Sequence, residues 1–334
     1  MITSKKYKAM VVHEHENNTY SREIVDKEIS SLPEGDILIN VKYSSLNYKD
    51  ALSATGNKGV TRNYPHTPGI DAAGIVVRSI NDNFKIGDFV LVTGYDLGMN
   101  TPGGYGQYIS VPADWVVKLP ESLSLNESMI YGTAGFTAAL SVYKLIASGI
   151  TPSDGDILVT GATGGVGSIA VSILNKLGYS VIASTGKAEA KRMLLEMGAK
   201  DIILREELDD RSGKSLLKGR WAGVIDTVGG NILSTALKST KYGGSVTSCG
   251  NVASSELSTT VYPFILRGIS ILGVDSVQCH MELRIKLWNL LSNDWKPDNL
   301  ALNVQEVSLM DLDTKIQSIL EGKLIGRTIL NLDL

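Results

Sequence analysis

The stretch that decides the fold is Asp156–Gly167, whose sequence is DILVTGATGGVG. The apolar run Ile157–Thr160 leads directly into a glycine-rich turn. From Val166 to Leu177, apolar residues then recur at alternating spacings of three and one, which predicts an amphipathic helix packed on a sheet. A strand, a turn and a helix N-terminus therefore follow one another. Free backbone N–H groups and the helix dipole suit such a turn to a pyrophosphate, so the stretch predicts dinucleotide binding.

The turn departs from the usual G-x-G-x-x-G spacing at one position, where Ala162 replaces the first glycine. The strand before the turn, the helix after it and a second strand about twenty residues further on still favour a cofactor site over a structural turn. The residues that we expect to bind the cofactor here are Thr163, Gly164, Gly165 and Val166.

The end of the second strand indicates which cofactor binds. An acidic residue there would hold a ribose 2′-hydroxyl, but Val181–Ala183 is followed by Ser184, Thr185, Gly186 and Lys187. Hydroxyl groups and an ammonium accept a 2′-phosphate, which a carboxylate would repel. We therefore predict NADP(H) rather than NAD(H), with Lys200 as a further cation. The alternative is that Lys187 is only a solvated residue at a helix start.

Strands and helices alternate on both sides of this stretch, which is typical of a doubly wound parallel sheet. The expected strands of this Rossmann-type domain are Ile157–Thr160, Ser180–Ala183, Asp201–Leu204, Val224–Asp226, Ser245–Ser248 and Ile269–Gly273. A helix is expected before them at Leu125–Ala147 and another after them around Glu282–Leu291.

The first third of the chain is different, because short β-rich runs alternate with turn clusters there. The expected strands are Lys8–Val12, Ile37–Tyr43, Ala72–Val77, Phe89–Thr93 and Tyr108–Val111. A late strand, Thr328–Leu332, is expected to return to this β-rich part. We thus predict an α/β protein with a β-rich catalytic domain at residues 1–126 and 278–334 and a Rossmann domain at 127–277.

Chain length, net charge and cysteine count exclude several classes of protein. The 334 residues exceed the roughly 250–300 at which a single core stops growing. A net charge of −3 gives no global field for nucleic acid or an anionic membrane. The two cysteines, Cys249 and Cys279, are too few for a disulfide framework and suit a reducing compartment. We expect a cytoplasmic protein with no nucleic-acid or membrane partner.

Four motifs resemble the medium-chain dehydrogenase/reductase superfamily: the glycine turn and the segments Ser44–Asp50, Pro68–Gly74 and Tyr131–Ala138. Three further runs resemble its zinc-free branch of acrylyl-CoA reductases and quinone oxidoreductases, namely Asp226–Gly230, Thr260–Gly268 and Gly273–Val277. The resemblance covers nearly the whole chain. It implies a GroES-like catalytic domain beside a Rossmann domain, the cofactor in the cleft between them, and a homodimer.

The zinc enzymes of that superfamily bind their catalytic metal through residues that this chain lacks. Their first cysteine ligand is matched by Asn47, their Gly-His-Glu run by Gly69–Asp71, and a later cysteine by a position at or near Thr133. A catalytic zinc site needs three converging N, S or O ligands, and one carboxylate among amides and hydroxyls does not supply them. We therefore expect no metal site.

The same resemblance assigns roles to residues that spacing alone would not reveal. It places Asn47 and Tyr48 on the floor of the active site, with Asp71 orienting Asn47 or relaying a proton, and Tyr48 also within reach of the nicotinamide ribose. Arg327 would contact a cofactor or acyl-CoA phosphate, or else lie on the surface. Residues expected beside the nicotinamide are Asn251, Ile265 and Ser276.

Without a metal or a thiolate, the reaction that asks least of the protein is hydride addition to an electron-poor C=C bond. The resemblance implies an NADPH-dependent reductase of a small 2-enoyl thioester of the acrylyl-CoA type, with Lys49, Lys58 and Arg62 as cations for CoA. One alternative is an NADPH-dependent quinone or enone reductase. Another is a non-catalytic NADPH-binding sensor. A homodimer is also favoured by the apolar last strand of the sheet, whose edge a partner would cover.

Overall fold

The computed structural model describes residues 5–334, and its contacts divide the chain into two compact units. Unit 1 runs to Thr133 and resumes at Val277–Ser292 and Asn303–Leu334. Unit 2 comprises Ala134–Ser276 and Asn293–Leu302. The domain limits expected from the sequence stay a prediction.

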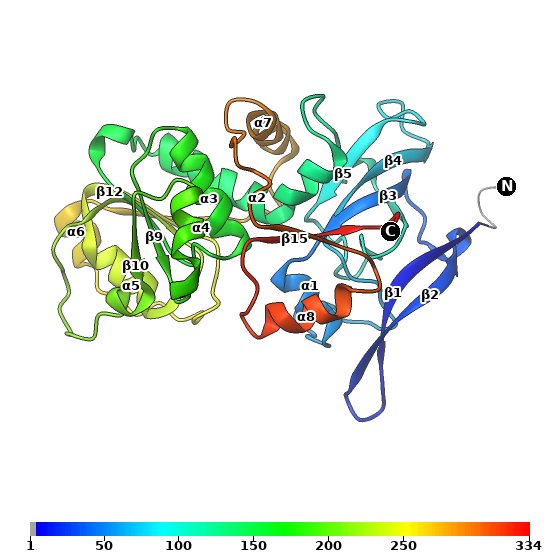
Figure 1. Ribbon diagram of the computed structural model, residues 1–334, viewed down its shortest axis with the longest axis horizontal. Helices are drawn as coiled ribbons and strands as arrows, with labels where there is room; N and C mark the ends of the chain where they lie inside the picture. The colour runs from blue at the N-terminus through cyan, green and yellow to red at the C-terminus, as the bar shows by residue number, and fades with distance from the viewer. Residues whose placement is uncertain (1–4) are drawn as a thin grey trace. The chain divides into compact units, whose positions relative to one another are not determined.

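Unit 1 is built around a mainly antiparallel sheet with the order β14-β15-β3-β4-β5-β7, in which β6 also pairs with β3. Figure 1 labels β15, β3, β4 and β5 of this sheet. Its strands are β3 (Ile37–Ser45), β4 (Asp71–Ser79), β5 (Phe89–Thr93), β6 (Tyr108–Val111), β7 (Val116–Lys118), β14 (Val304–Val307) and β15 (Arg327–Asn331). A separate hairpin joins β1 (Lys6–Glu14) to β2 (Tyr20–Glu28). The late strand returns to this sheet as predicted, because Ile329 of β15 pairs with Ser45 of β3.

Two helices pack against this sheet and share its hydrophobic core. Alpha-helix α1 (Tyr48–Ala54) follows β3 and packs beside α8 (Leu312–Leu320), as Figure 1 shows. The apolar faces of the strands and of these two helices form one core, which includes Val41, Ala51 and Ile316. Two more helices belong wholly or partly to this unit, α7 (Met281–Ser292) and the first part of α2 (Leu125–Ala147).

Unit 2 is a parallel six-stranded sheet with the order β10-β9-β8-β11-β12-β13. Its strands are β8 (Ile157–Val159), β9 (Val181–Thr185), β10 (Asp201–Leu204), β11 (Trp221–Asp226), β12 (Thr240–Ser248) and β13 (Ser270–Gly273). The helices that connect them are α3 (Gly165–Lys176), α4 (Lys191–Glu196), α5 (Gly230–Ser239) and α6 (Tyr262–Arg267). This strand order reverses beside β8, which is the point where doubly wound sheets bind ligands.

The predicted α/β class, with a GroES-like β-rich part and a Rossmann sheet, is confirmed. Between residues 5 and 334, no helix is long and apolar enough to cross a membrane.

Candidate active site

The centre of the candidate site in unit 1 is the side chain of Asp71, the first residue of β4. Asp71 is completely buried, and four donor atoms on three residues point at its carboxylate. Ser45 donates through Oγ at 2.5 Å and Asn47 through Nδ2 at 2.8 Å. Thr133 donates its N–H to both oxygens, at 3.0 and 2.9 Å, and its hydroxyl at 2.6 Å. A carboxylate that accepts this many bonds is held in one orientation.

A second buried carboxylate, Asp50, lies next to it in the first turn of α1. Its Oδ2 accepts the backbone N–H of Asn47 at 2.8 Å, and its Oδ1 accepts the N–H of Ile70 at 2.8 Å. Asp50 thus links the start of α1 to the segment that leads into β4. Burial, followed by the negative charge of Asp71, raises the pKa of Asp50 to about 7.

A break in α2 brings Thr133 to Asp71. Gly132 has φ +50° and ψ −154°, which interrupts the helix and lets its backbone approach the carboxylate. A Cβ at this position would lie 2.4 Å from Asp71 Oδ2 and 3.0 Å from Nη2 of Arg327. Only glycine fits here. We call Ser45, Asn47, Asp50, Asp71, Thr133 and Arg327 the Asp71 cluster.

The structure revises the roles expected for the three catalytic candidates. Asp71 is buried and its contacts are internal, so it is placed to orient Asn47 but not to touch a substrate. The amide N–H groups of Asn47 are also used internally, because Nδ2 donates to Asp71 and lies 3.2 Å from Oδ2 of Asp50. Tyr48 differs: its side chain is 43% exposed, and its hydroxyl has no hydrogen-bond partner within residues 5–334. Tyr48 is therefore the candidate that can donate to a substrate.

Arg327 does not lie where a phosphate ligand was expected. It is the first residue of β15, is only 5% exposed, and donates from Nε to the carbonyl of Ile130 at 2.8 Å. Pairing of β15 with β3 turns this side chain into the interior of unit 1. The expectation of a surface or phosphate-facing arginine is corrected to a buried member of the Asp71 cluster.

The positions that match the zinc ligands of related enzymes do lie close together, since Asn47 and Thr133 both bind Asp71. The donors are an amide, a hydroxyl and a carboxylate whose oxygens already accept bonds from four donor atoms. These groups do not fit a zinc ion, which prefers thiolate and imidazole ligands. Across residues 5–334, no group of three or more His, Cys, Asp or Glu side chains could hold a metal ion.

Unit 2 carries the predicted glycine turn at the carboxyl end of β8. Gly164 caps α3, so the helix begins at Gly165 as the sequence pattern predicts. Gly161 has φ +59°, and a Cβ on Gly167 would lie 2.4 Å from the carbonyl oxygen of Gly161. The turn therefore needs glycine at both ends. The residues expected to bind the cofactor lie at the N-terminus of α3. The N–H of Gly164 donates to the carbonyl of Gly161 at 3.0 Å, so the donors that suit a pyrophosphate are the N–H groups of Gly165 and Val166 at the start of the helix.

The end of β9 differs from the expectation, because the strand ends two residues later than predicted, at Thr185. Ser184 and Thr185 belong to β9, pair with β10 and are each only 2% exposed. The Thr185 hydroxyl accepts the N–H of Lys187 at 2.9 Å. Gly186 is exposed, and a Cβ there would lie 3.0 Å from Cζ of Arg205. The solvent-facing cations at this edge are thus Lys187 and Arg205, while both hydroxyls are buried.

Of two further expected cofactor contacts, that of Lys200 is corrected by the structure and that of Ile265 stays a prediction. Lys200 precedes β10 and donates to Asp156 at 2.9 Å, at the amino ends of the strands, so it lies a strand length of roughly 10–15 Å from the glycine turn. Ile265 lies on α6, is 67% exposed and precedes Arg267 by two residues. Arg267 donates to carbonyls of Lys238 and Thr240 near the amino end of β12, and a contact of Ile265 with the cofactor stays a prediction.

The other two residues expected near the nicotinamide do follow carboxyl strand ends. Asn251 comes after β12, and Ser276 comes after β13, where its hydroxyl accepts a bond from Thr137 at 2.8 Å. Their contacts with a cofactor stay predictions.

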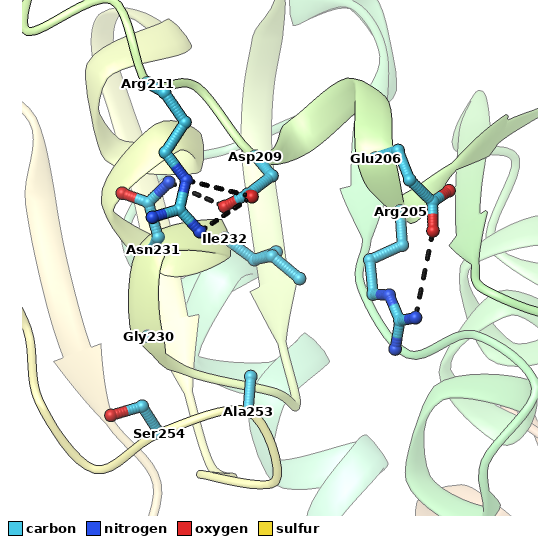
Figure 2. Close-up of a pocket in the computed structure, with 9 residues that line it drawn as sticks. All are labelled: Arg205, Glu206, Asp209, Arg211, Gly230, Asn231, Ile232, Ala253 and Ser254. Carbon is cyan, nitrogen blue, oxygen red and sulfur yellow. Dashed lines mark hydrogen bonds and ion pairs between the residues drawn. The ribbon is translucent and has the colours of Figure 1, made fainter.

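A pocket of about 580 Å³ opens at the same edge of the sheet, and Figure 2 shows its lining. It lies between the residues that follow β10 and the N-terminus of α5. Asp209 binds Arg211 at 2.9 Å and Asn231 at 2.7 Å, whereas the one ion pair of Arg205 within residues 5–334 is with Glu206 at 3.8 Å. Arg205 therefore keeps donors for an incoming anion. No sequence motif marked Arg205, although its place directly after β10, a strand that pairs with β9, was a usable signal.

Comparison with known proteins agrees with this fold and site. Residues 33–121 match the alcohol dehydrogenase GroES-like domain, and residues 165–293 match the zinc-binding dehydrogenase family. The chain is 40% identical over 328 residues to the acrylyl-CoA reductase AcuI of Ruegeria pomeroyi, covering 98% of this chain and 99% of that protein. It is 50% identical over 302 residues to a Bacillus subtilis protein named "Putative quinone oxidoreductase YhfP", covering 90% and 92%.

Two solved structures are similar over nearly the whole chain. The yhdH oxidoreductase of Salmonella enterica in complex with NADP has a TM-score of 0.95 and 41% identity, covering 97% of this chain and 99% of that one. Bacillus subtilis yhfP with NAD bound has a TM-score of 0.96 and 47% identity, covering 98% and 100%. This chain belongs to the medium-chain dehydrogenase/reductase family, and it is an oxidoreductase that uses a nicotinamide cofactor.

Proposed function

We propose that this protein reduces the activated C=C bond of a small 2-enoyl thioester of the acrylyl-CoA type with NADPH. The 40% identity to an acrylyl-CoA reductase over 98% of the chain supports this substrate class. The observation that carries the proposal is Tyr48, directly beside the Asp71 cluster, which is 43% exposed and whose hydroxyl has no hydrogen-bond partner among residues 5–334. A hydrogen-bond donor at the oxygen where negative charge develops is what an enolate-forming reduction requires.

Tyr48 is the first helical residue of α1, and its neighbour Asn47 is fixed by Asp71 and Asp50. The phenol therefore projects from a rigid helix start. We assign it to donate a hydrogen bond to the thioester oxygen, where negative charge grows as the β carbon gains a hydride. One such donor is worth roughly 3 kcal/mol in the transition state. A proton from solvent then adds to the α carbon, which balances the reduction.

The cofactor, when bound, supplies the hydride. Residues of unit 2 that fit it are the N–H groups of Gly165 and Val166 for the pyrophosphate and Lys187 with Arg205 for the 2′-phosphate. A carboxylate that would repel this phosphate is absent from the end of β9, which favours NADPH over NADH. The NAD found in Bacillus subtilis yhfP argues for testing both cofactors.

The test is oxidation of NADPH at 340 nm with acrylyl-CoA, with 1,4-benzoquinone in a parallel assay. We expect turnover of acrylyl-CoA, and a Tyr48→Phe variant with kcat lowered about 100-fold at unchanged NADPH affinity. Tyr43→Phe is the matched control, because its hydroxyl already accepts a bond from Asn331 at 3.3 Å.

Turnover of benzoquinone alone would contradict the thioester proposal. Full turnover of acrylyl-CoA by Tyr48→Phe would contradict the role of Tyr48 while leaving the substrate class intact. NADPH binding without turnover of either acceptor would favour the non-catalytic sensor.

A quinone or enone reductase is the second candidate, and one contact favours it. Lys58, one of the cations expected to hold CoA, donates to Glu14 at 2.7 Å and to the carbonyl of Arg62 at 3.3 Å. It also lies 4.8 Å from the ring centre of Tyr64. An ammonium with these partners is already neutralised, which weakens the case for a CoA-phosphate clamp at this place.

We also propose that the protein forms a homodimer through the free edge of β13. This strand pairs only with β12 among the described strands, and its residues are largely exposed. Ile271 is 39% exposed, and Leu266 of the neighbouring α6 is 57% exposed. An unpaired apolar edge invites a second copy. Sedimentation velocity should show a dimer, and Ile271→Lys should shift it to a monomer; a wild-type monomer at micromolar concentration would contradict the proposal.

A further inference from the structure

The guanidinium of Arg327 ties together segments that are distant in the chain. Besides the carbonyl of Ile130, it donates to the carbonyls of Leu46 at 3.3 Å and Met129 at 3.4 Å. Its Nη1 also lies 3.4 Å from Oδ1 of Asn47. These acceptors belong to the approach to α1 and to the turn of α2 before its break. Arg327 thus fixes both segments to β15.

Arg327 also fixes the orientation of the Asn47 amide. With Oδ1 facing a guanidinium donor, Nδ2 must face the carboxylates of Asp71 and Asp50. The reverse orientation would set a carbonyl against two carboxylates. Tyr48, whose side chain is exposed, is the next residue after Asn47. By holding the side chain of Asn47, Arg327 therefore also fixes the backbone from which Tyr48 projects.

The Asp71 cluster buries two carboxylates and one guanidinium, whose charges do not cancel. Asp50 and Asp71 are both completely buried, and Arg327 is 5% exposed. The groups whose charges act on Asp50 or Arg327 are Asp50 itself, Asp71, Tyr105 and Arg327. Two carboxylates and one guanidinium leave one uncompensated negative charge, which burial makes costly. The raised pKa of Asp50, about 7, relieves this cost by protonation.

We propose that Arg327 is a positioning residue of the reaction, which acts as the buried counter-charge of Asp71 and Asp50 and thereby holds Asn47 and the start of α1 in place. The inference rests on the proposed function for the part that Tyr48 plays in it. This role differs from binding a phosphate, because the guanidinium acts through its contacts inside unit 1 and does not touch the substrate or the cofactor.

The experiment compares Arg327→Met, Arg327→Lys and Arg327→Met/Asp50→Asn. Arg284→Met is the matched control, since Arg284 is also completely buried and donates to the backbone carbonyls of Thr93 and Val277. For each variant we would measure NADPH affinity by fluorescence, kcat against pH with an acceptor that the wild type reduces, and urea unfolding from pH 5 to 8.

We expect Arg327→Met to lower kcat at least 50-fold while NADPH affinity changes less than threefold. Loss of the counter-charge should move the acidic limb of the kcat profile up by about one pH unit, because the carboxylates then retain a proton more strongly. Asp50→Asn removes one negative charge, so kcat of the double variant should be at least fivefold higher than that of Arg327→Met. Arg284→Met should lower stability without moving the pH profile.

Arg327→Lys keeps the charge and loses the fork of donors. It should keep the wild-type pH profile with a smaller loss of kcat, and it serves if Arg327→Met does not fold. NADPH affinity weakened tenfold or more at unchanged kcat would overturn the proposal in favour of a phosphate ligand. Additive losses and unmoved pH profiles would overturn it in favour of a merely structural residue.

The unfolding measurements separate this inference from the proposed function. Non-additive destabilisation by Arg327→Met and Asp50→Asn tests the charge balance without any acceptor. If no enoyl thioester is reduced, the proposed function fails, while this coupling still decides the role of Arg327.

Discussion

The Asp71 cluster of unit 1 and the glycine turn of unit 2 prepare their sites in opposite ways. The cluster is buried, and its polar groups are satisfied by one another, which leaves Tyr48 as the exposed donor beside it. The turn is open, and it offers backbone N–H groups at the start of α3. One site is held by side chains from distant segments, and the other by the conformation of a few consecutive residues.

This difference shows where each site is vulnerable. A cluster of buried charges fails when one partner is lost, because the remaining partners are desolvated and unpaired. A glycine turn fails when a Cβ is added, because the backbone can no longer approach itself or a phosphate.

The largest effect is expected for Asp71→Ala. It removes the acceptor of Ser45, Asn47 and Thr133 and leaves Arg327 without one of the two buried carboxylates whose charges act on it. We expect a loss of about 3–5 kcal/mol in the free energy of unfolding, measured in urea, together with loss of turnover. A loss below 1 kcal/mol would show that the cluster is not the rigid centre of unit 1.

The next effect is a pH dependence of stability that Asp50 imposes. Its folded-state pKa of about 7 is raised above the ordinary value of 3.8, so its stabilising contribution is present at low pH and is lost as pH rises toward 7. The stability difference between wild type and Asp50→Asn should therefore shrink from pH 4 to pH 8, by at most about 4 kcal/mol. Urea unfolding across this range measures it, and a constant difference would contradict it.

A comparison with unit 2 sharpens this prediction. Burial also raises the pKa of Asp226, which accepts bonds from Thr160 at 2.7 Å and from the N–H of Gly229 at 2.9 Å. Asp226→Asn should remove its own pH-dependent contribution and leave that of Asp50 unchanged, because the two carboxylates belong to different units.

A third prediction concerns the glycine turn itself. Gly167→Ala places a Cβ 2.4 Å from a backbone oxygen, so NADPH affinity should fall about 100-fold as the turn distorts. Gly164→Ala meets its nearest atom at 3.4 Å and should keep the fold. Fluorescence titration with NADPH and circular dichroism measure the two effects. Equal affinities in both variants would show that the close approach is not needed.

The smallest effect is expected at the edge of unit 2. Arg205→Ala should raise the KM for NADPH about tenfold and leave the KM for NADH unchanged, because only NADPH carries the 2′-phosphate. Lys200→Ala is the control, since its ammonium is paired with Asp156 at the opposite edge. A larger loss in Lys200→Ala than in Arg205→Ala would reverse the assignment made from the structure.

The two regions also differ in how far the sequence predicts them, because the glycine turn depends on consecutive residues and the Asp71 cluster on distant segments. The start of α3 was predicted from the sequence because the strand, the turn and the amphipathic pattern of the helix follow one another in a single continuous stretch. The hairpin strand β2 was missed because its polar residues Ser21, Arg22, Asp26 and Lys27 hide the alternation. The end of β9 was placed two residues early because Ser184 and Thr185 look like loop residues, although strand pairing buries them.

The sequence by itself determined the class of fold, the dinucleotide turn and the absence of thiolate and imidazole at the matched zinc positions, because these depend on local order and residue type. Only the tertiary structure decided that Arg327 is internal and that the N–H groups of Asn47 donate to carboxylates. It also decided that Arg205 lies at the carboxyl edge of the sheet, whereas Lys200 lies at the opposite edge. The reason is physical: these contacts join residues as far apart as Asn47 and Arg327, 280 positions along the chain, and only strand order and burial bring such groups together.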